Sequence, residues 1–224
     1  MLVFSKVIVF SLVFFLFSFS KLISAQSATE SLVEVLEEMT SLEGRFIQQT
    51  YAIEGEQLNT SSGIFKVKRP YFFYWHVLTP GENLLVSDGS QVWDYDVDLE
   101  QVIQTKIESD KLYNSPMHII SGGIESISRH YQIELDDSPN NFILIPKELG
   151  SGFTRLSLTF ENRVLTKMEM TDAFAQRTEI LLVTTKLNPS LESDMFKLKV
   201  PEGIDIIFNG IGYGDINMDR SRDD

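Results

Sequence analysis

The spacing of apolar residues changes at two points in the first half of the chain, and each change predicts a new element. From Ser31 to Leu42, apolar residues recur at helical intervals, and Ser31 with Glu34 matches a capping box. Gly44 is the predicted end of this helix. From Arg45 the interval becomes two, which is typical of a strand. The sequence therefore predicts one amphipathic helix followed by strands, with a polar loop over residues 54–62.

The stretch 63–101 holds both tryptophans and the densest aromatic run, residues 71–75. Phe65 and Val67 alternate with lysines before it. Turn signals at residues 79–82 and 87–90 separate apolar runs, so an antiparallel meander is predicted, closed by residues 102–105. From Tyr71 to Leu78 only His76 is strongly polar. Both faces of this strand are therefore expected to meet apolar surroundings, and one of them a large apolar space.

The second half of the chain predicts another helix and further strands. Pro116 suits a first helical turn, and Gly122-Gly123 interrupts the helix, which should be weak there. A mixed stretch with helical character precedes it at 107–113. A tail from residue 209 is expected to lack fixed structure. The predicted strands cover residues 131–135, 142–145, 154–160, 164–170, 178–185 and 196–200.

These elements predict a mainly β (α+β) fold in one domain, residues 26–208. Roughly 11 short strands would form a highly curved antiparallel sheet, an incomplete β-barrel. The helices have no second sheet to pack on, so they should form a lid over the concave, apolar side. The lid residues are expected to be Leu32, Leu36, Met39, Met117, Ile120 and Ile124.

The N-terminus has the features of a cleaved signal peptide, residues 1–25. Lys6 precedes an almost wholly apolar run over residues 7–19, and Ala25 offers a small residue before the cut. The run is short for a membrane span, although an uncleaved anchor is the alternative. Removal of Lys6 and Lys21 leaves 17 basic and 32 acidic residues, a net charge of −15. The sequence therefore predicts an exported protein.

Composition excludes several functions. The 224 residues include no cysteine and carry a net charge of −13, so disulfides and thiolate chemistry are excluded and nucleic acid is not an expected partner. Asp94, Asp96 and Asp98 have the spacing of a calcium loop, but Leu99 stands where its glycine is required. The three histidines have no metal-ligand spacing, and no nucleophile motif occurs. We expect no metal, no cofactor and no catalysis.

Several motifs, in order and spacing, resemble the periplasmic outer-membrane lipoprotein carrier family (LolA). The departures are Val97, where the family often has proline, Ala175, where it often has glycine, and a longer tail. The matching motifs are Phe46-x-Gln48, Lys68-Arg69-Pro70, Phe73-Tyr74-Trp75, Pro80, residues 85–89, Val92-Trp93-x-Tyr95-Asp96, Glu100-Gln101, Leu144-x-Pro146, Gln176-x-Thr178 and residues 196–203.

The resemblance implies a carrier, expected to be a monomer, that receives acylated lipoproteins from an inner-membrane ABC transporter and delivers them to an outer-membrane receptor. An acyl chain of about 15 methylenes costs on the order of 12 kcal/mol to expose, so it needs an apolar shelter in water. The alternatives are a carrier of another lipid, such as a phospholipid, and a periplasmic hydrolase. The expected cavity residues are Phe65, Tyr71, Phe73, Trp75 and Trp93, although each aromatic could be ordinary core.

Arg69 is the charged residue of most interest, because it shares strand parity with Tyr71, Phe73 and Trp75. Inside a cavity its guanidinium would need acceptors. The resemblance implies that this arginine bonds to the lid backbone and helps to hold the lid shut. A strand-end arginine that reaches out to water is the alternative.

Overall fold

The computed structural model describes residues 27–107, 116–138, 140–148 and 152–209. The predicted signal peptide and the stretch 108–113 lie outside these residues. Three helices belong to the fold, α1 (Ala28–Glu38), α2 (Pro116–Ser121) and α3 (Ile124–His130), with a short 3-10 helix, η1 (Ser193–Phe196). The strands are β1 (Ser41–Tyr51), β2 (Gln57–Lys68), β3 (Phe72–Thr79), β4 (Asn83–Asp88), β5 (Gln91–Asp96), β6 (Gln101–Lys106), β7 (Tyr131–Leu135), β8 (Asn141–Pro146), β9 (Arg155–Glu161), β10 (Val164–Thr171), β11 (Arg177–Leu187) and β12 (Asp205–Asn209).

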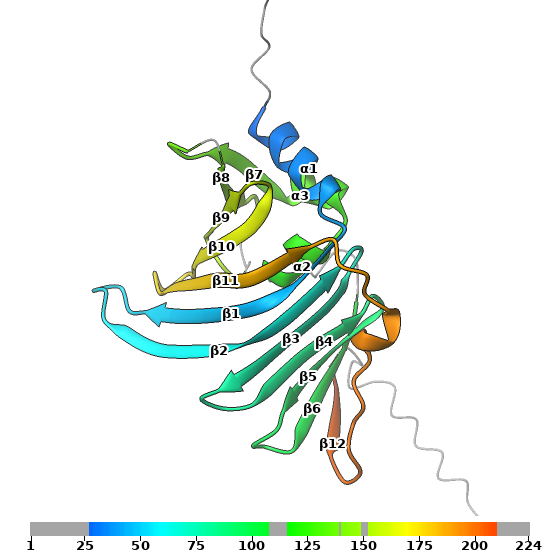
Figure 1. Ribbon diagram of the computed structural model, residues 1–224. Coiled ribbons are helices and arrows are strands. Elements are labelled where there is room, and N and C mark those ends of the chain that lie inside the picture. The colour runs from blue at the N-terminus through cyan, green and yellow to red at the C-terminus, as the bar shows by residue number, and fades with distance from the viewer. Residues whose placement is uncertain (1–26, 108–115, 139, 149–151, 210–224) are drawn as a thin grey trace, which may run out of the picture.

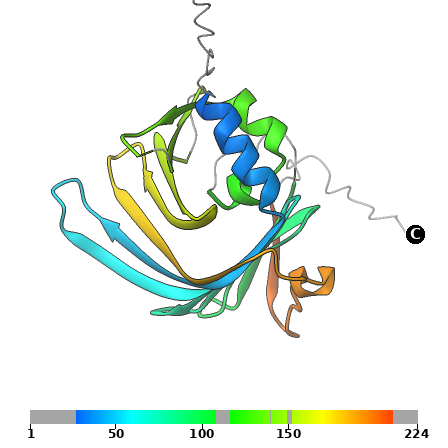
Figure 2. The same cartoon turned by 45° about the horizontal axis from the view of Figure 1, so that its top comes forward.

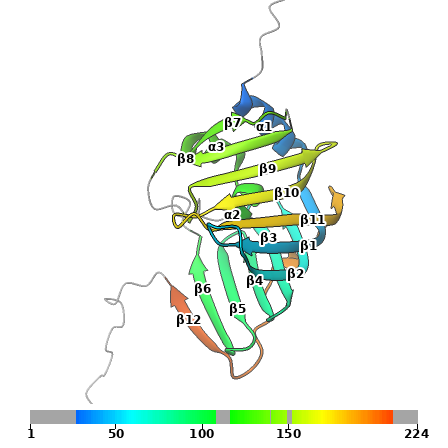
Figure 3. The same cartoon turned by 90° about the vertical axis from the view of Figure 1, so that its left-hand side faces the viewer.

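One mixed sheet contains all 12 of these strands, in the order β12-β6-β5-β4-β3-β2-β1-β11-β10-β9-β8-β7. Neighbouring strands are antiparallel except β12, which runs parallel to β6. The mainly β prediction is confirmed, but the purely antiparallel one is wrong at this edge. Figure 3 shows the strands fanning from β7 to β12 around one continuous curve. The meander from β3 to β6 is confirmed with its turns in the predicted places.

The helices lie on the concave side of this sheet. Figure 1 shows α1 and α3 beside β7 at one end, with α2 inside the curve near β3. Figure 2 shows the strands as a C-shaped wall with the helices on its open side, and η1 outside the wall. The main core therefore lies between the concave face and the helices, where 25 buried residues form one hydrophobic cluster.

The first helix begins and ends earlier than the sequence pattern predicts. Ser27, not Ser31, is its N-cap, and Ser27 and Glu30 exchange both hydrogen bonds of a capping box. Gly44, the predicted helix end, lies within β1 instead. A Cβ there would lie 3.0 Å from both the Phe65 ring and the Val183 carbonyl oxygen, so glycine fits this close approach better than any residue with a side chain. The sequence analysis placed the helix end too late because Leu42, the first apolar residue of β1, continues the helical spacing of Leu36 and Met39.

Three further boundaries differ from prediction. The predicted loop 54–62 is mostly strand, because the polar residues of β2 pair with β1 while their side chains face water. Gly122-Gly123 does not merely weaken a helix but separates α2 from α3, with Gly123 as the second N-cap. The predicted strand 196–200 is absent: Phe196 is the last residue of η1, and residues 197–200 have no regular secondary structure. The sheet gains β12 instead, which the sequence analysis missed.

Candidate functional site

Cross-strand register brings the inward side chains of β1 to β5 into two rows on the concave face. One row runs through Leu42, Val67, Phe73, Ser87 and Val92, each opposite the next and all of them buried. The second row joins Phe65, Trp75 and Leu85. Three of the predicted cavity residues, Phe65, Phe73 and Trp75, therefore belong to one apolar wall.

Trp75 lies at the aromatic centre of this wall. Its indole stacks on Phe46 with ring centroids 3.8 Å apart, and the Phe65 ring lies 5.9 Å away. Phe46 was missed as a site residue, because the sequence analysis assigned no inward residue on this strand. The structure buries Phe46 and leaves Ile47 exposed on the other face. The available signal was the spacing from Leu42 to Phe46, which share one strand parity.

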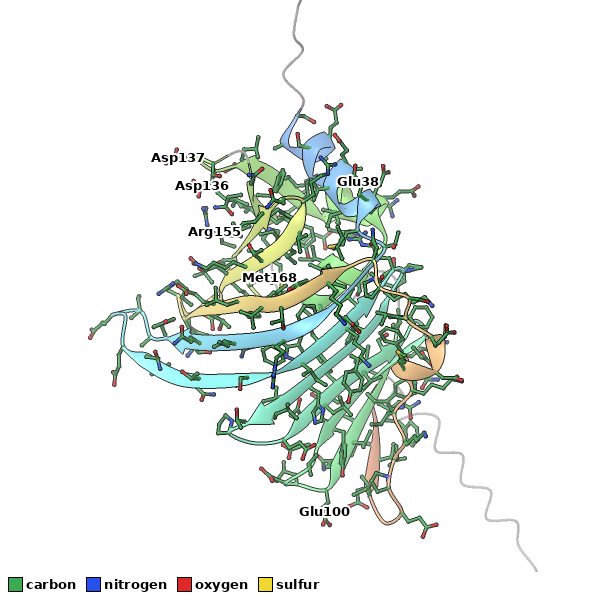
Figure 4. All side chains as sticks on the ribbon, in the orientation of Figure 1. Glu38, Glu100, Asp136, Asp137, Arg155 and Met168 are labelled. Carbon is green, nitrogen blue, oxygen red and sulfur yellow. The ribbon has the colours of Figure 1, made fainter. Side chains whose placement is uncertain are left out.

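The wall continues through the other half of the sheet, where sequence analysis predicted the strands but not their inward residues. Phe142 pairs with Leu158, Leu158 with Met168, and Met168 with Ile180. Figure 4 labels Met168 on the inner part of this half. The buried residues of the wall on β8 to β11 are Phe142, Leu144, Leu156, Leu158, Phe160, Leu165, Met168, Ile180 and Leu182.

All six predicted lid residues face this wall. Leu32, Leu36 and Met39 from the N-terminal segment are fully buried, as is Ile120 of α2, and Met117 of α2 is buried. Ile124 of α3 is half-buried and packs against the same cluster. Helix side chains thus occupy the concave space that the sequence analysis expected to be a cavity.

Tyr71 and Trp93 do not join the wall. Tyr71 precedes β3 with a left-handed φ of 65°, its amide donates to the Ser121 carbonyl at 2.7 Å, and its hydroxyl lies close to Gly123. It therefore contacts the lid rather than the cavity. Trp93 pairs with Val86 on the opposite face of the sheet from Val92, so its predicted inward position is wrong. The outer face here has its own apolar contacts, where Phe72 meets Phe196 of η1 at 5.6 Å.

Arg69 connects the strand side to the lid through the backbone. Its Nη1 donates to the Gly122 carbonyl at 3.1 Å and its Nη2 to the Ile119 carbonyl at 3.4 Å. Its Nε is buried without a hydrogen-bond partner among the described residues. Burial lowers the pKa of Arg69 to about 10, with a smaller opposing effect of Tyr71. The guanidinium therefore stays charged at neutral pH while it holds the end of α2.

A second arginine connects the lid to the far half of the sheet. Arg163, in the turn between β9 and β10, donates to Glu34 at 3.0 Å and forms an ion pair with Glu38, both on α1. The hydrogen bonds that Arg163 donates to Glu38 and, with a smaller effect, to Glu34 raise the pKa of Arg163. Glu38 is labelled in Figure 4 on the side of α1 that faces solvent. An open hollow of about 280 Å³ between α1, β8 and β9 lies beside this contact.

The described residues were also compared with what a metal site and a membrane-spanning helix require. They contain no group of three or more potential metal-binding side chains. No helix within these ranges is long and apolar enough to cross a membrane. An apolar concave wall covered by helices, with two arginines that hydrogen-bond to those helices, is compatible with a binding protein for apolar ligands.

Comparison with known proteins agrees with this class. The family model described as "Outer membrane lipoprotein carrier protein LolA" matches residues 37–199. The outer-membrane lipoprotein carrier protein of Azotobacter vinelandii is 36% identical over 193 residues, 85% of this chain and 93% of its own length. That of Pseudomonas paraeruginosa is 37% identical over 183 residues, 81% and 88% of the two chains.

A solved structure supports the fold alone. An uncharacterized conserved protein from Thermus thermophilus superposes with a TM-score of 0.51 at 16% identity, covering 82% of this chain and all of its own. The family match and the sequence relatives carry the assignment: the chain belongs to the LolA family of outer-membrane lipoprotein carrier proteins. Its function is that of a lipoprotein carrier, and carriers of this family are periplasmic and not enzymes.

Proposed function

We propose that acyl chains of lipoprotein cargo occupy the concave face of the sheet after α1, α2 and α3 move away from it. The sheet then acts as an incomplete barrel and the helices as its lid. The observation that carries this proposal is the contact between wall and lid, which is apolar on both sides: Leu36 and Ile120 are fully buried opposite a wall that includes Phe73. Acyl methylenes can replace these side chains while the wall stays shielded from water.

The lid is built for such exchange. Helices α2 and α3 have six and seven residues, so neither is long enough to be stable away from the sheet by itself. Apolar packing and the two Arg69 hydrogen bonds hold them in place. Arg69 therefore favours the closed, empty state and, with it, the release of cargo. The predicted cavity residues Phe65, Phe73 and Trp75 would meet the acyl chains, together with Phe46.

Membership of the family supports a proposal for the proteins that deliver lipoproteins to this carrier and receive them from it. We infer that a periplasmic domain, residues 26–208, remains after removal of residues 1–25, and that residues 209–224 follow it as a tail. It acts as a monomer, takes lipoproteins from an inner-membrane ABC transporter and delivers them to an outer-membrane receptor. The energetic reason is that each exposed methylene costs about 0.8 kcal/mol, so acylated cargo cannot cross water alone.

A displacement experiment tests the proposal. An apolar fluorophore, bis-ANS, should gain fluorescence on binding the mature chain, and a triacylated lipopeptide should displace it. The same peptide without acyl chains is the control and should leave the signal unchanged. Absence of binding and displacement would contradict the acyl-binding site. Mass spectrometry of copurified material would reveal a phospholipid carrier instead, if phospholipid and not lipoprotein is found.

A further inference from the structure

A hollow of about 300 Å³ lies on the convex face of the sheet, away from the lid. It spans β2, β1 and β11 where β11 departs from regular pairing opposite Gly44, and Thr184 there has a left-handed φ of 52°. The lining residues are Glu43, Gly44, Arg45, Ile64, Phe65, Lys66, Thr184 and Lys186.

The charge of this hollow is opposite to that of the chain. Its lining has three basic side chains and one carboxylate, whereas the chain carries −13. Lys186 pairs with the carboxylate, Glu43, at 2.8 Å. Arg45 is exposed and has no ion pair with any residue that the structure describes, and Lys66 reaches only the Met195 sulfur and the Tyr74 ring. Two cations therefore remain without a carboxylate partner.

Apolar side chains adjoin these cations on the same face. Ile47 is directly opposite Leu181, and Val183 is opposite Arg45 in the β1–β11 register. Their exposed fractions are 39%, 38% and 36%, although they are in the middle of the sheet rather than at an edge. Basic side chains beside exposed apolar ones favour a ligand that is both acidic and apolar.

We propose that this convex surface docks a segment of a partner protein in which acidic and apolar residues alternate. Carboxylates of the segment would pair with Arg45, Lys66 and Lys186, and its apolar residues would cover Ile47, Leu181 and Val183. A protein segment fits better than an anionic membrane, because a segment can contact the basic hollow alone, whereas a bilayer would also approach the rest of a chain whose net charge is −13. The surface is separated from the lid by the sheet, so docking and cargo binding can occur together.

The test uses the mature full chain and two fluorescent pentapeptides, Glu-Leu-Glu-Leu-Glu and its neutral counterpart Gln-Leu-Gln-Leu-Gln. Anisotropy at low salt should show at least tenfold tighter binding of the acidic peptide, with the difference lost at high salt through screening. Replacement of Arg45, Lys66 and Lys186 by Gln should weaken the acidic peptide by about tenfold, which is about 1.4 kcal/mol. Release of a bound triacylated lipopeptide should not change.

A matched triple variant makes the test specific. Lys106, Arg155 and Lys199 are exposed bases outside the hollow, so their replacement by Gln changes the net charge equally and should leave peptide binding unchanged. Equal binding of the two peptides, or equal weakening by both triple variants, would overturn the proposal. Binding of phosphatidylglycerol vesicles in place of the peptide, dependent on the same three bases, would assign the surface to a membrane and overturn it as well.

Discussion

Two arginines attach the covering helices to the two halves of the sheet, and they do so in different ways. Arg69 reaches the lid from the β2–β3 side, with a buried Nε and donors to two backbone carbonyls. Arg163 reaches it from the β9–β10 turn and pairs with two half-exposed carboxylates of α1. Burial lowers the pKa of Arg69, whereas its carboxylate partners raise that of Arg163.

The difference shows which attachment can control opening. At Arg69 the contact is partly buried and the Nε is fully buried, so loss of the contact leaves poorly hydrated polar groups without partners until the lid moves. At Arg163 water and salt ions can replace each carboxylate at once, so the ion pairs add little to closure. We infer that Arg69 sets the balance between open and closed states, while α1 is held by its apolar face and only oriented by Arg163.

The largest expected effect is that of Leu36→Ala in α1. Leu36 is fully buried in the wall–lid contact, so its truncation should lower the free energy of unfolding by about 2–5 kcal/mol. Urea unfolding of the empty mature chain measures this. Leu181→Ala is the matched control, because Leu181 is half-exposed on the convex face. Similar losses for both variants would contradict the view that apolar packing holds α1.

Next in size is Arg69→Leu. The variant removes both hydrogen bonds to the lid, each of which contributes roughly 1.5–3 kcal/mol for a charged donor. Cargo uptake should persist, but retention of a labelled lipoprotein should tighten by about tenfold or more when release to the receptor is followed. Arg69→Lys should restore release only in part, since lysine lacks the planar fork of donors.

The control for this experiment is Arg155→Leu, on the exposed side of β9 (Figure 4), which should release cargo normally. Normal release but impaired uptake by Arg69→Leu would place the arginine at cargo entry and refute its role in closure.

A smaller effect is expected for Arg163→Gln. Because the ion pairs to Glu34 and Glu38 are largely hydrated, the midpoint of thermal unfolding should fall by no more than about 2 °C. The shift should vanish in 1 M salt, where such pairs are screened. A larger loss that persists at high salt would show that this attachment resembles the one at Arg69.

The smallest expected effect is that of pH on the Arg69 contact. A base whose folded pKa is lowered is penalised in its charged form, and the penalty is relieved only as pH rises through that pKa, here about 10. Arg69 thus binds its proton in folded and unfolded chains alike at lower pH. The difference in cargo release between wild type and Arg69→Leu should therefore be constant from about pH 6 to pH 8.5. A marked change within that range would show that another group titrates at the contact.

The local spacing of apolar and turn residues predicted the secondary structure correctly where neighbours in the chain determine it. The aromatic run and its flanking turn residues predicted β3 to β6, because strand alternation and turn chemistry act over a few residues. The same alternation identified Phe65, Phe73 and Trp75 as wall residues. It failed at Trp93, where both faces of the strand carry apolar residues, so the pattern could not distinguish inward from outward.

The sequence by itself therefore determined the mainly β class and the membership of a carrier family, whereas the roles of the lid residues and of Arg69 stay predictions. Tertiary structure decided what depends on partners distant in the chain. The parallel edge strand β12 exists only because β6 lies beside it. The polar residues of β2 form a strand only because β1 pairs with them. The hollow at Gly44 brings Arg45, Lys66 and Lys186 together from three strands. The spacing of residues along the chain cannot predict this proximity, because it depends on how the strands pair.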